Sequence, residues 1–214
     1  MSDVYTSFFK SATTPELARQ LLGKTLTYQT LNGLVGGLIV ETEAYVGAQD
    51  RAAHSFGNRR TPSNEGLYGP GGSLYIYSQR QYFFFDIATQ EQDNPEGILI
   101  RAIQPTLGLE IMEQNRQKHG FDLTNGPGKL MQAFGVTDKS ENLRKLAESR
   151  FAIDFKNYRI PEEIIATPRI GISQAEPYWA EIPLRFVVAG NRAANGSGMC
   201  REDCRDCRDP VLNV

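Results

Sequence analysis

The sequence predicts an α+β fold, a single mixed domain around a curved, largely antiparallel sheet from which a β-hairpin protrudes. Runs of apolar residues typical of strands dominate the middle of the chain. The segments between these runs are often too short for the helical crossovers that parallel strands need. The chain has 214 residues, 40% of them hydrophobic, which suits one core. We therefore expect one domain over residues 1–195.

The expected elements follow in chain order. A helix begins at Thr14, where Pro15 and Glu16 form a favourable first turn, and it ends before Gly23. Strands are expected in seven segments, 25–29, 34–41, 73–78, 82–89, 97–104, 169–172 and 184–189. Further helices are expected in three segments, 107–117, 129–135 and 141–149.

The stretch 44–72 has little periodicity and lies between two strands. Loops of this length inside compact domains tend to be functional. The hairpin follows it, and alternation along its first strand places Tyr75 and Tyr77 on one face. Two tyrosines on one strand face form either a half-buried sheet surface, which is the commoner case, or a platform for stacking.

The two ends of the chain suggest no targeting or membrane segment. The N-terminus lacks the pattern of a secretory signal, and no apolar run is long enough to span a bilayer. We expect a soluble monomer in the cytoplasm or nucleoid. Residues 196–214 read as a disordered, charged tail that contains Cys200, Cys204 and Cys207, rather than as a disulfide framework, a zinc site or an iron–sulfur site.

The formal net charge of −2 weighs mildly against a nucleic-acid partner, because binding to phosphates normally needs a cationic face. A local groove can still be positive on an acidic protein. The basic residues at places of interest are Arg59, Arg60, Arg80, Arg101 and Lys129.

Two acids, Glu41 and Glu43, lie where an apolar strand meets the long loop. A carboxylate in such a position suits general-base work, although both acids can equally be solvated or paired at a strand end. Arg101 interrupts an apolar strand, so it forms either a structural ion pair or a support for a catalytic carboxylate and its water. His54 is either a structural histidine or a donor in a pocket. With two histidines in the chain, a histidine-rich metal site is not expected.

These residues fall in motifs that occur in one order: IVETEAYVGAQDRAAHS, RRTPSNEG, GGSLYIY, ILIRAIQP, NGPGKLMQAFGV and RIGIS. From about Glu16 to about Gly190 the chain closely resembles the alkyladenine (3-methyladenine) DNA glycosylase family. The resemblance implies a repair enzyme that flips alkylated or deaminated purines out of double-stranded DNA and hydrolyses the N-glycosidic bond, leaving an abasic site. It implies neither a metal nor a cofactor. Lyase activity is not expected, because no lysine stands at position 43.

The resemblance also assigns the catalytic residues. Glu43 matches the general base that activates the water, and Glu41 becomes a structural acid. Arg101 matches the arginine that helps to hold the water, and the backbone carbonyl of Ile170 matches a further acceptor for it.

The resemblance assigns the base-binding and DNA-binding residues in the same way. Tyr45 and Tyr77 match the aromatic residues that sandwich the flipped base, which favours a cationic alkylated purine through stacking and cation–π attraction. His54 matches the side chain at the edge of the base, and Ala52 lies where the backbone contacts it. Lys129 matches a contact to phosphate.

Two positions depart from the family. At the hairpin tip, relatives carry a tyrosine followed by glycine, whereas this chain has Gln79 and Arg80 as its expected DNA contacts. Arg80 is the candidate for insertion into the duplex. The family's asparagine after the hairpin aligns with Asp86, where a second acid raises the pKa of one of the two carboxyls or attracts a cationic base more strongly.

The departures predict an altered lesion preference or weaker binding to duplex DNA. Two alternatives to a DNA glycosylase remain. One is a binder of damaged DNA without catalysis, and the other is a hydrolase of nucleosides or RNA bases.

Overall fold

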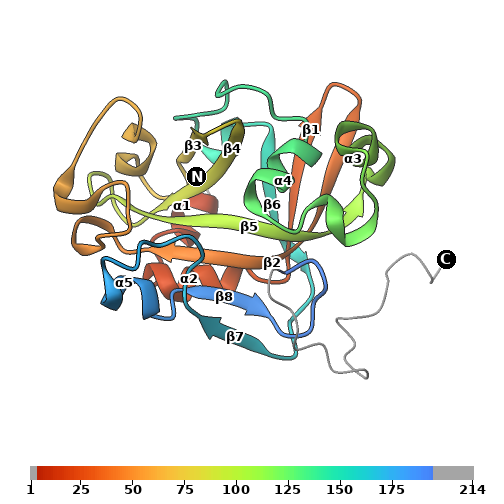
Figure 1. Cartoon of the computed structure of the whole chain (residues 1–214). Coiled ribbons are helices and arrows are strands. Elements are labelled where there is room, and N and C mark those ends of the chain that lie inside the picture. The colour runs from red at the N-terminus through yellow and green to blue at the C-terminus, as the bar shows by residue number, and fades with distance from the viewer. Residues whose placement is uncertain (1–3, 195–214) are drawn as a thin grey trace.

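The computed structural model describes residues 4–194, and their strands form one antiparallel sheet (Figure 1). The predicted α+β class with a largely antiparallel sheet is confirmed. The sheet runs in the order β3-β4-β5-β2-β1-β6, and β8 joins it by pairing with β2 and β7. The strands are β1 Lys24–Thr30, β2 Gly33–Tyr45, β3 Leu74–Gln79, β4 Tyr82–Thr89, β5 Glu96–Leu107, β6 Phe151–Tyr158, β7 Ile164–Thr167 and β8 Arg185–Val188.

Strand β2 lies at the centre of the sheet. Its first half pairs with β1, its second half pairs with β8, and its other edge pairs with β5 along most of its length. Such a strand is surrounded on both edges and both faces, which explains its long apolar run. The two acids predicted as general-base candidates lie in its second half, between β5 and β8.

Five helices accompany the sheet in residues 4–194: α1 Val4–Phe8, α2 Thr14–Leu21, α3 Leu109–Arg116, α4 Pro127–Ala133 and α5 Pro177–Glu181. Helix α2 begins at Thr14 as predicted, and the carboxylate of Glu16 accepts a hydrogen bond from the N–H of Thr13 at 3.0 Å. Its buried face covers β2, where the hydroxyl of Thr42 donates to the carbonyl of Ala18 at 2.9 Å. Because neighbouring residues of a strand point to opposite faces, Glu43 points away from α2.

Two expected elements differ in the structure. Residues 169–172 form a turn rather than a strand, and Gly171 supplies the positive φ of +81° that this turn needs. Residues 141–149 are not a helix, apart from a short 3-10 segment at Leu146–Glu148. They run along the free edge of β3 instead, where the side-chain oxygen of Asn142 accepts the N–H of Ile76 at 2.8 Å. The hydrogen bonds that pair with this free strand edge form in place of those that the expected helix would make.

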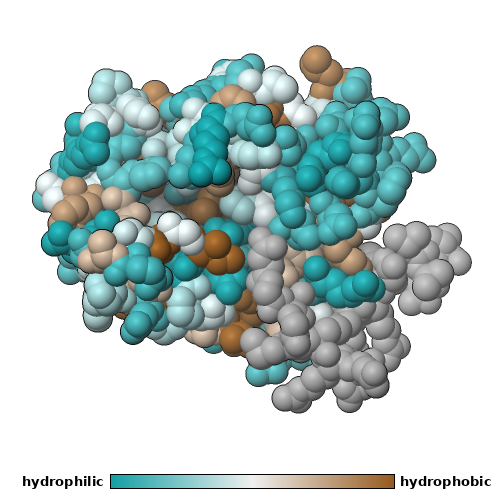
Figure 2. Space-filling model, in the orientation of Figure 1, coloured by the Kyte–Doolittle hydropathy of each residue, from teal (hydrophilic) through white to brown (hydrophobic). Residues whose placement is uncertain are grey.

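The predicted tail at 196–214, with its three cysteines, lies outside the described residues. None of the described helices is long and apolar enough to cross a membrane. The surface over α3 and α4 is mainly hydrophilic, whereas hydrophobic residues gather near the middle of the same face (Figure 2).

Candidate active site

A double irregularity in the pairing of β2 with β5 marks the site. Ile39 pairs with Ile103 and Glu41 with Ala102, but Thr42 pairs with Ile100, so the register passes over Arg101. A bulge of this kind re-aims the side chain of the extra residue. It brings the Arg101 guanidinium between the two acids of β2.

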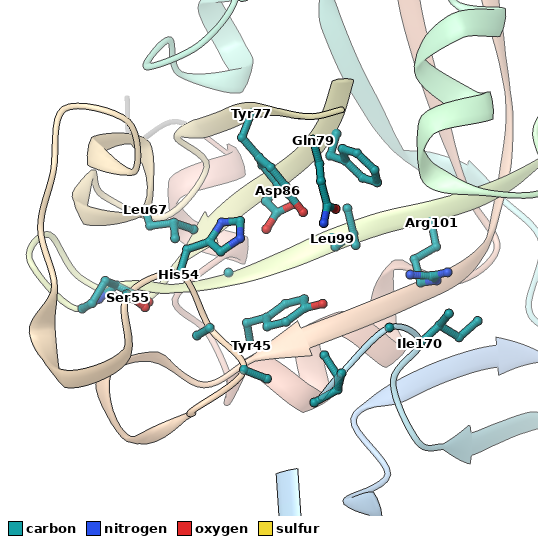
Figure 3. A pocket seen from close by; sticks show the side chains of 17 residues that line it. Tyr45, His54, Ser55, Leu67, Tyr77, Gln79, Asp86, Leu99, Arg101 and Ile170 are labelled. Carbon is teal, nitrogen blue, oxygen red and sulfur yellow. The ribbon is translucent and has the colours of Figure 1, made fainter. Parts of the chain in front are cut away.

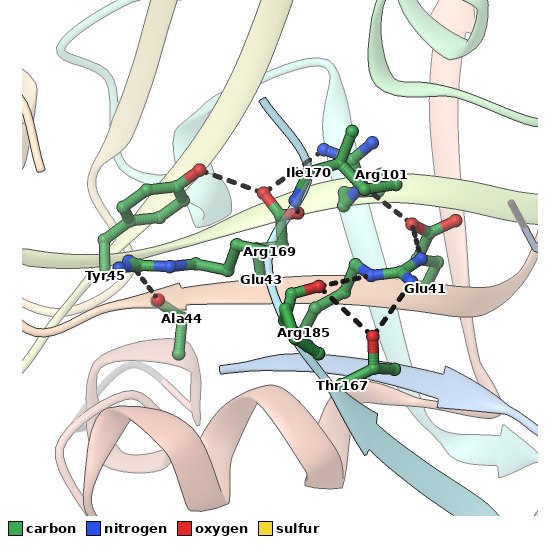
Figure 4. A network of polar contacts seen from close by, with 10 residues as sticks. Glu41, Glu43, Ala44, Tyr45, Arg101, Thr167, Arg169, Ile170 and Arg185 are labelled. Atoms are coloured by element: carbon green, nitrogen blue, oxygen red, sulfur yellow. Dashed lines mark hydrogen bonds and ion pairs between the residues drawn. The ribbon is translucent and has the colours of Figure 1, made fainter. Parts of the chain in front are cut away.

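Glu43 is fully buried and held by three donors (Figure 4). Its Oε1 accepts the backbone N–H of Ile170 at 2.8 Å. Its Oε2 accepts the hydroxyl of Tyr45 at 2.9 Å and lies 3.2 Å from Nη1 of Arg101. The three contacts fix the orientation of the carboxylate. Burial, followed by the charge of Glu43, raises the pKa of the Tyr45 hydroxyl well above its usual value, which keeps its proton available for donation.

Glu41 belongs to a second network behind Glu43. Its Oε1 accepts Nε of Arg101 at 2.7 Å and Nη1 of Arg185 at 3.0 Å. Arg185 also donates from Nε to the carbonyl of Pro168 at 3.0 Å. Glu41 therefore positions Arg101 and, through Arg185, ties β8 to the turn that carries Ile170.

An ion pair in which both side chains are fully buried also holds the turn at 169–172 in place. Arg169 and Asp50 are joined by two contacts, 2.6 Å from Nη1 and 2.9 Å from Nη2. Asp50 also accepts the backbone N–H of Ala52 at 3.0 Å, and the guanidinium of Arg169 lies 4.6 Å from the centre of the Tyr45 ring. The pair thus connects the turn at 169–172, the start of the long loop and one aromatic side chain.

A cavity of about 230 Å³ opens in front of these networks (Figure 3). Tyr45 and Tyr77 border it on opposite sides, with His54 at one end and Arg101 and Ile170 at the other. Its further lining residues include Ala52, Ser55, Leu67, Gln79, Phe84, Asp86 and Leu99. Glu43 is not among the lining residues, but it contacts three that are, Tyr45, Arg101 and Ile170.

The tyrosines of the hairpin are packed by other aromatic rings. Tyr77 stacks on Phe84 at 5.2 Å between ring centres and on Tyr75 at 4.8 Å, and its edge meets the ring of His54. The Nδ1 atom of His54 is 2.8 Å from the hydroxyl of Tyr75. Burial, followed by the charge of Arg59, lowers the pKa of His54, which favours the neutral ring.

Asp86 enters the cavity from β4. Cross-strand pairing places it opposite Tyr75 on one side and Leu99 on the other, and Leu99 in turn lies opposite Glu43. Residues directly opposite one another share a sheet face, so these four side chains face the same way. Asp86 is 5% exposed, and its Oδ1 has no hydrogen-bond partner among residues 4–194.

The hairpin tip reaches the cavity through Gln79, and helix α4 packs against β4. Gln79 pairs with Tyr82 across a two-residue turn, and Arg80 has a positive φ of 55° there. The side chain of Gln79 reaches toward the cavity (Figure 3). Helix α4 begins against Tyr82, and Lys129 on this helix is exposed with its Nζ 2.8 Å from the Asn125 side-chain oxygen.

The structure brings most of the predicted residues together at the cavity, whereas Arg80 and Lys129 are not among the residues that line it. Ile170 donates its N–H to Glu43, and its carbonyl stays the predicted further acceptor for the water. Sequence reasoning missed Asp50, Arg169 and Arg185. A basic residue beside an apolar run singled out Arg101, and the same signal was present at Arg169.

Comparison with known proteins gives one consistent result. The family model described as methylpurine-DNA glycosylase (MPG) matches residues 7–192. Three relatives bear the name "Putative 3-methyladenine DNA glycosylase". The one from Lactobacillus johnsonii is 56% identical over 188 residues, which is 87% of this chain and 90% of the relative. The one from Lactobacillus delbrueckii subsp. bulgaricus (strain ATCC BAA-365 / Lb-18) is 53% identical over 94% of this chain and 97% of the relative. The one from Enterococcus faecalis is 44% identical over 86% and 80%.

Proposed function

The chain belongs to the methylpurine-DNA glycosylase family and is a DNA glycosylase of DNA repair, and we propose that it releases 3-methyladenine and related damaged purines through a water activated by Glu43. One observation carries the proposal. A fully buried carboxylate, oriented by three donors, lies directly behind a cavity bordered by two tyrosines. The reaction breaks the N-glycosidic bond and leaves an abasic site in the DNA.

The cavity suits a base that has been turned out of the duplex. A base inside the helix must leave its stack before an enzyme can reach the sugar carbon. Tyr45 and Tyr77 supply flat surfaces on two sides of the cavity, and such surfaces stack well on electron-poor purines. His54 and the backbone at Ala52 lie where they meet an edge of the base.

The contacts of Glu43 leave room for one water. An ionised carboxylate offers about four positions for hydrogen-bond donors. Tyr45 occupies Oε2 by a hydrogen bond and Arg101 by an ion pair, and the N–H of Ile170 occupies one position on Oε1. The remaining position on Oε1 accepts the water, and Glu43 takes its proton as the water attacks the sugar carbon. The carbonyl of Ile170 stays the predicted second acceptor for that water.

Glu41 is a poorer base, although it is equally buried. Its Oε1 is engaged by both Arg101 and Arg185, and it lies in the network behind Arg101 rather than beside the cavity. Removal of its charge would also loosen Arg101. We therefore assign Glu41 a positioning role.

The variant Glu43→Gln tests the proposal. It keeps the size of the side chain and removes the base, so we expect the release of 3-methyladenine, 7-methylguanine, hypoxanthine and ethenoadenine from duplex DNA to fall by at least about a hundredfold. Release is measured as abasic-site formation under single-turnover conditions. The matched control is Glu91→Gln, because Glu91 is exposed and contacts only Lys10 at 3.2 Å among the described side chains.

Other outcomes separate the alternatives. Equal base release by the wild type and Glu43→Gln, with lesion binding retained by both, would favour a binder without catalysis. Release from mononucleosides at a rate independent of polymer length would favour a nucleoside hydrolase. The absence of release from every lesion, in duplex and single strand, would contradict the proposed enzyme.

A further inference from the structure

Asp86 is a buried acid in the base cavity that no neighbouring side chain satisfies. Its Oδ1 has no hydrogen-bond partner among residues 4–194, and its residue is 5% exposed. An unpaired buried polar group is costly, and a charged one costs more. A group kept at that cost in a cavity points to a ligand that pairs with it.

The arginine that lines the cavity does not pair with Asp86. Arg101 lines the same cavity, but its guanidinium forms ion pairs with Glu41 at 2.7 Å and with Glu43 at 3.2 Å. Around the cavity, two arginines, Arg101 and Arg185, therefore stand against three buried acids, Glu41, Glu43 and Asp86. The excess is one negative charge whenever Asp86 is ionised, and a ligand with one positive charge balances it.

The groups that face Asp86 come from every element packed around it. Tyr75 and Tyr77 lie on β3, Glu43 and Tyr45 on β2, and Leu99 and Arg101 on β5. From the long loop, His54 contacts Tyr75 and Tyr77. Burial, followed by the negative charge of Glu43, raises the pKa of the Asp86 carboxyl well above its usual value. The surroundings of Asp86 thus favour its protonated form.

We propose that Asp86 is the counter-ion of the base cavity and that it selects purines that carry a positive charge over neutral ones. This inference rests on the proposed function. Alkylation of a purine ring at N3 or N7 leaves a formal positive charge on the base, whereas hypoxanthine and ethenoadenine are neutral. When a cationic base enters between Tyr45 and Tyr77, the Asp86 proton passes to solvent and the carboxylate pairs with the base. A neutral base gains nothing from that exchange.

The test compares two lesions in one duplex sequence, 7-methylguanine and hypoxanthine, under single-turnover conditions. In Asp86→Asn the ratio of the two rates should fall by about tenfold or more, because the carboxamide has the same shape and no charge. The matched control is Asp93→Asn, the same chemical change at an exposed position paired with Arg60 at 2.7 Å. Asparagine also tolerates the positive φ of 67° at that position. An unchanged ratio in Asp86→Asn, or an equal loss in the control, overturns the proposal.

Binding gives a readout that does not depend on catalysis. In the Glu43→Gln background, the preference for the 7-methylguanine duplex over the hypoxanthine duplex should increase from about pH 6 to about pH 8, because the proton competes with the cation for Asp86. The double variant Glu43→Gln/Asp86→Asn should show no such increase. Identical preferences in the two proteins overturn the inference, whatever the activity of the wild type. The absence of base release by the wild type contradicts the proposed function instead, so the two failures are distinguishable.

Discussion

Arg169 and Asp50 form the most deeply buried ion pair of the site, and three parts of the chain depend on it. Neither side chain is exposed, and the pair is bidentate, which is the geometry in which arginine binds a carboxylate most strongly. Arg169 also donates to the carbonyl of Ala44 at 3.0 Å and covers the ring of Tyr45. The pair therefore fixes the wall of the cavity more than it stabilises any single element.

The variant Arg169→Met should lower the free energy of unfolding by about 3–5 kcal/mol, because it leaves the carboxylate of Asp50 buried without its cation. The double variant Arg169→Met/Asp50→Asn should lose clearly less, since the uncompensated charge is gone. Unfolding in urea measures both values. Equal losses in the single and double variants would show that lost packing, rather than an unpaired charge, is responsible.

At the scale of single residues, the sequence predicts a functional role when a side chain differs in polarity from its neighbours. Arg101 is conspicuous inside an apolar strand, and Glu43 could be separated from Glu41 only through the resemblance to a family. Asp50 has no such signal, because its partner is 119 positions away and the loop around it mixes polar and apolar residues without periodicity. For Ile170, only the fold shows that its N–H faces Glu43, and the contact of its carbonyl with the water stays a prediction.

At the tip of the hairpin β3–β4, the backbone conformation favours one residue type and the proposed contact with DNA favours another. Its two-residue turn requires a positive φ at Arg80, a conformation that favours glycine and costs other residues about 1–2 kcal/mol. An arginine retained at that cost is consistent with the proposed insertion of its side chain into the duplex. The tip also carries Gln79, which reaches back toward the cavity.

The variant Arg80→Gly should therefore stabilise the protein and impair it at once. We expect a gain of about 1 kcal/mol in the free energy of unfolding from the relieved backbone. We also expect base release from duplex DNA to slow by roughly tenfold, because nothing then replaces the lost stack. Release from single-stranded DNA should change little, since no stack has to be replaced there. Equal slowing on both substrates would contradict a role for Arg80 in the duplex.

Elements with their own periodicity were predicted well, and elements created by pairing were not. The strands of the hairpin and the helix at Thr14 carry local signals, and the structure contains them. Strand β7 is four residues long and exists through its pairing with β8. Strand β6 had a usable signal, since buried Phe151 and Ile153 alternate with an exposed residue. Segment 141–149 looked helical and is drawn instead to the edge of β3.

Segments that are far apart in the sequence meet at one cavity, and only the complete fold brings them together. Glu43, Arg101 and Ile170 come from β2, from β5 and from the turn before α5, and they meet because β2 is flanked by β5 and β8. The sequence predicted the fold class and named these three residues as candidates, but it did not predict the bulge that aims Arg101. It also could not show that Asp86 lacks a partner, because that depends on every element around the cavity.

The buried acid leaves a signature in the stability of the whole molecule. Because burial and Glu43 raise the pKa of Asp86 in the folded state, the folded protein keeps a proton that the unfolded chain releases above about pH 3.8. This contribution to stability is complete below that pH and is lost as the pH rises toward the folded pKa. His54 acts in the opposite direction, since burial lowers its pKa from 6.5 and its contribution is lost as the pH falls.

Comparison of Asp86→Asn with the wild type removes the effect of His54, which both proteins share. The free energy of unfolding of Asp86→Asn, relative to the wild type, should therefore increase from about pH 5 to about pH 8, by up to about 1.4 kcal/mol per pH unit while Asp86 keeps its proton. Urea unfolding at several pH values measures this difference. Parallel curves for the two proteins would mean that the Asp86 carboxyl ionises alike in the folded and unfolded states. A difference that grows with pH would show that the folded protein keeps a proton on Asp86, the state from which the proposed exchange with a cationic purine begins.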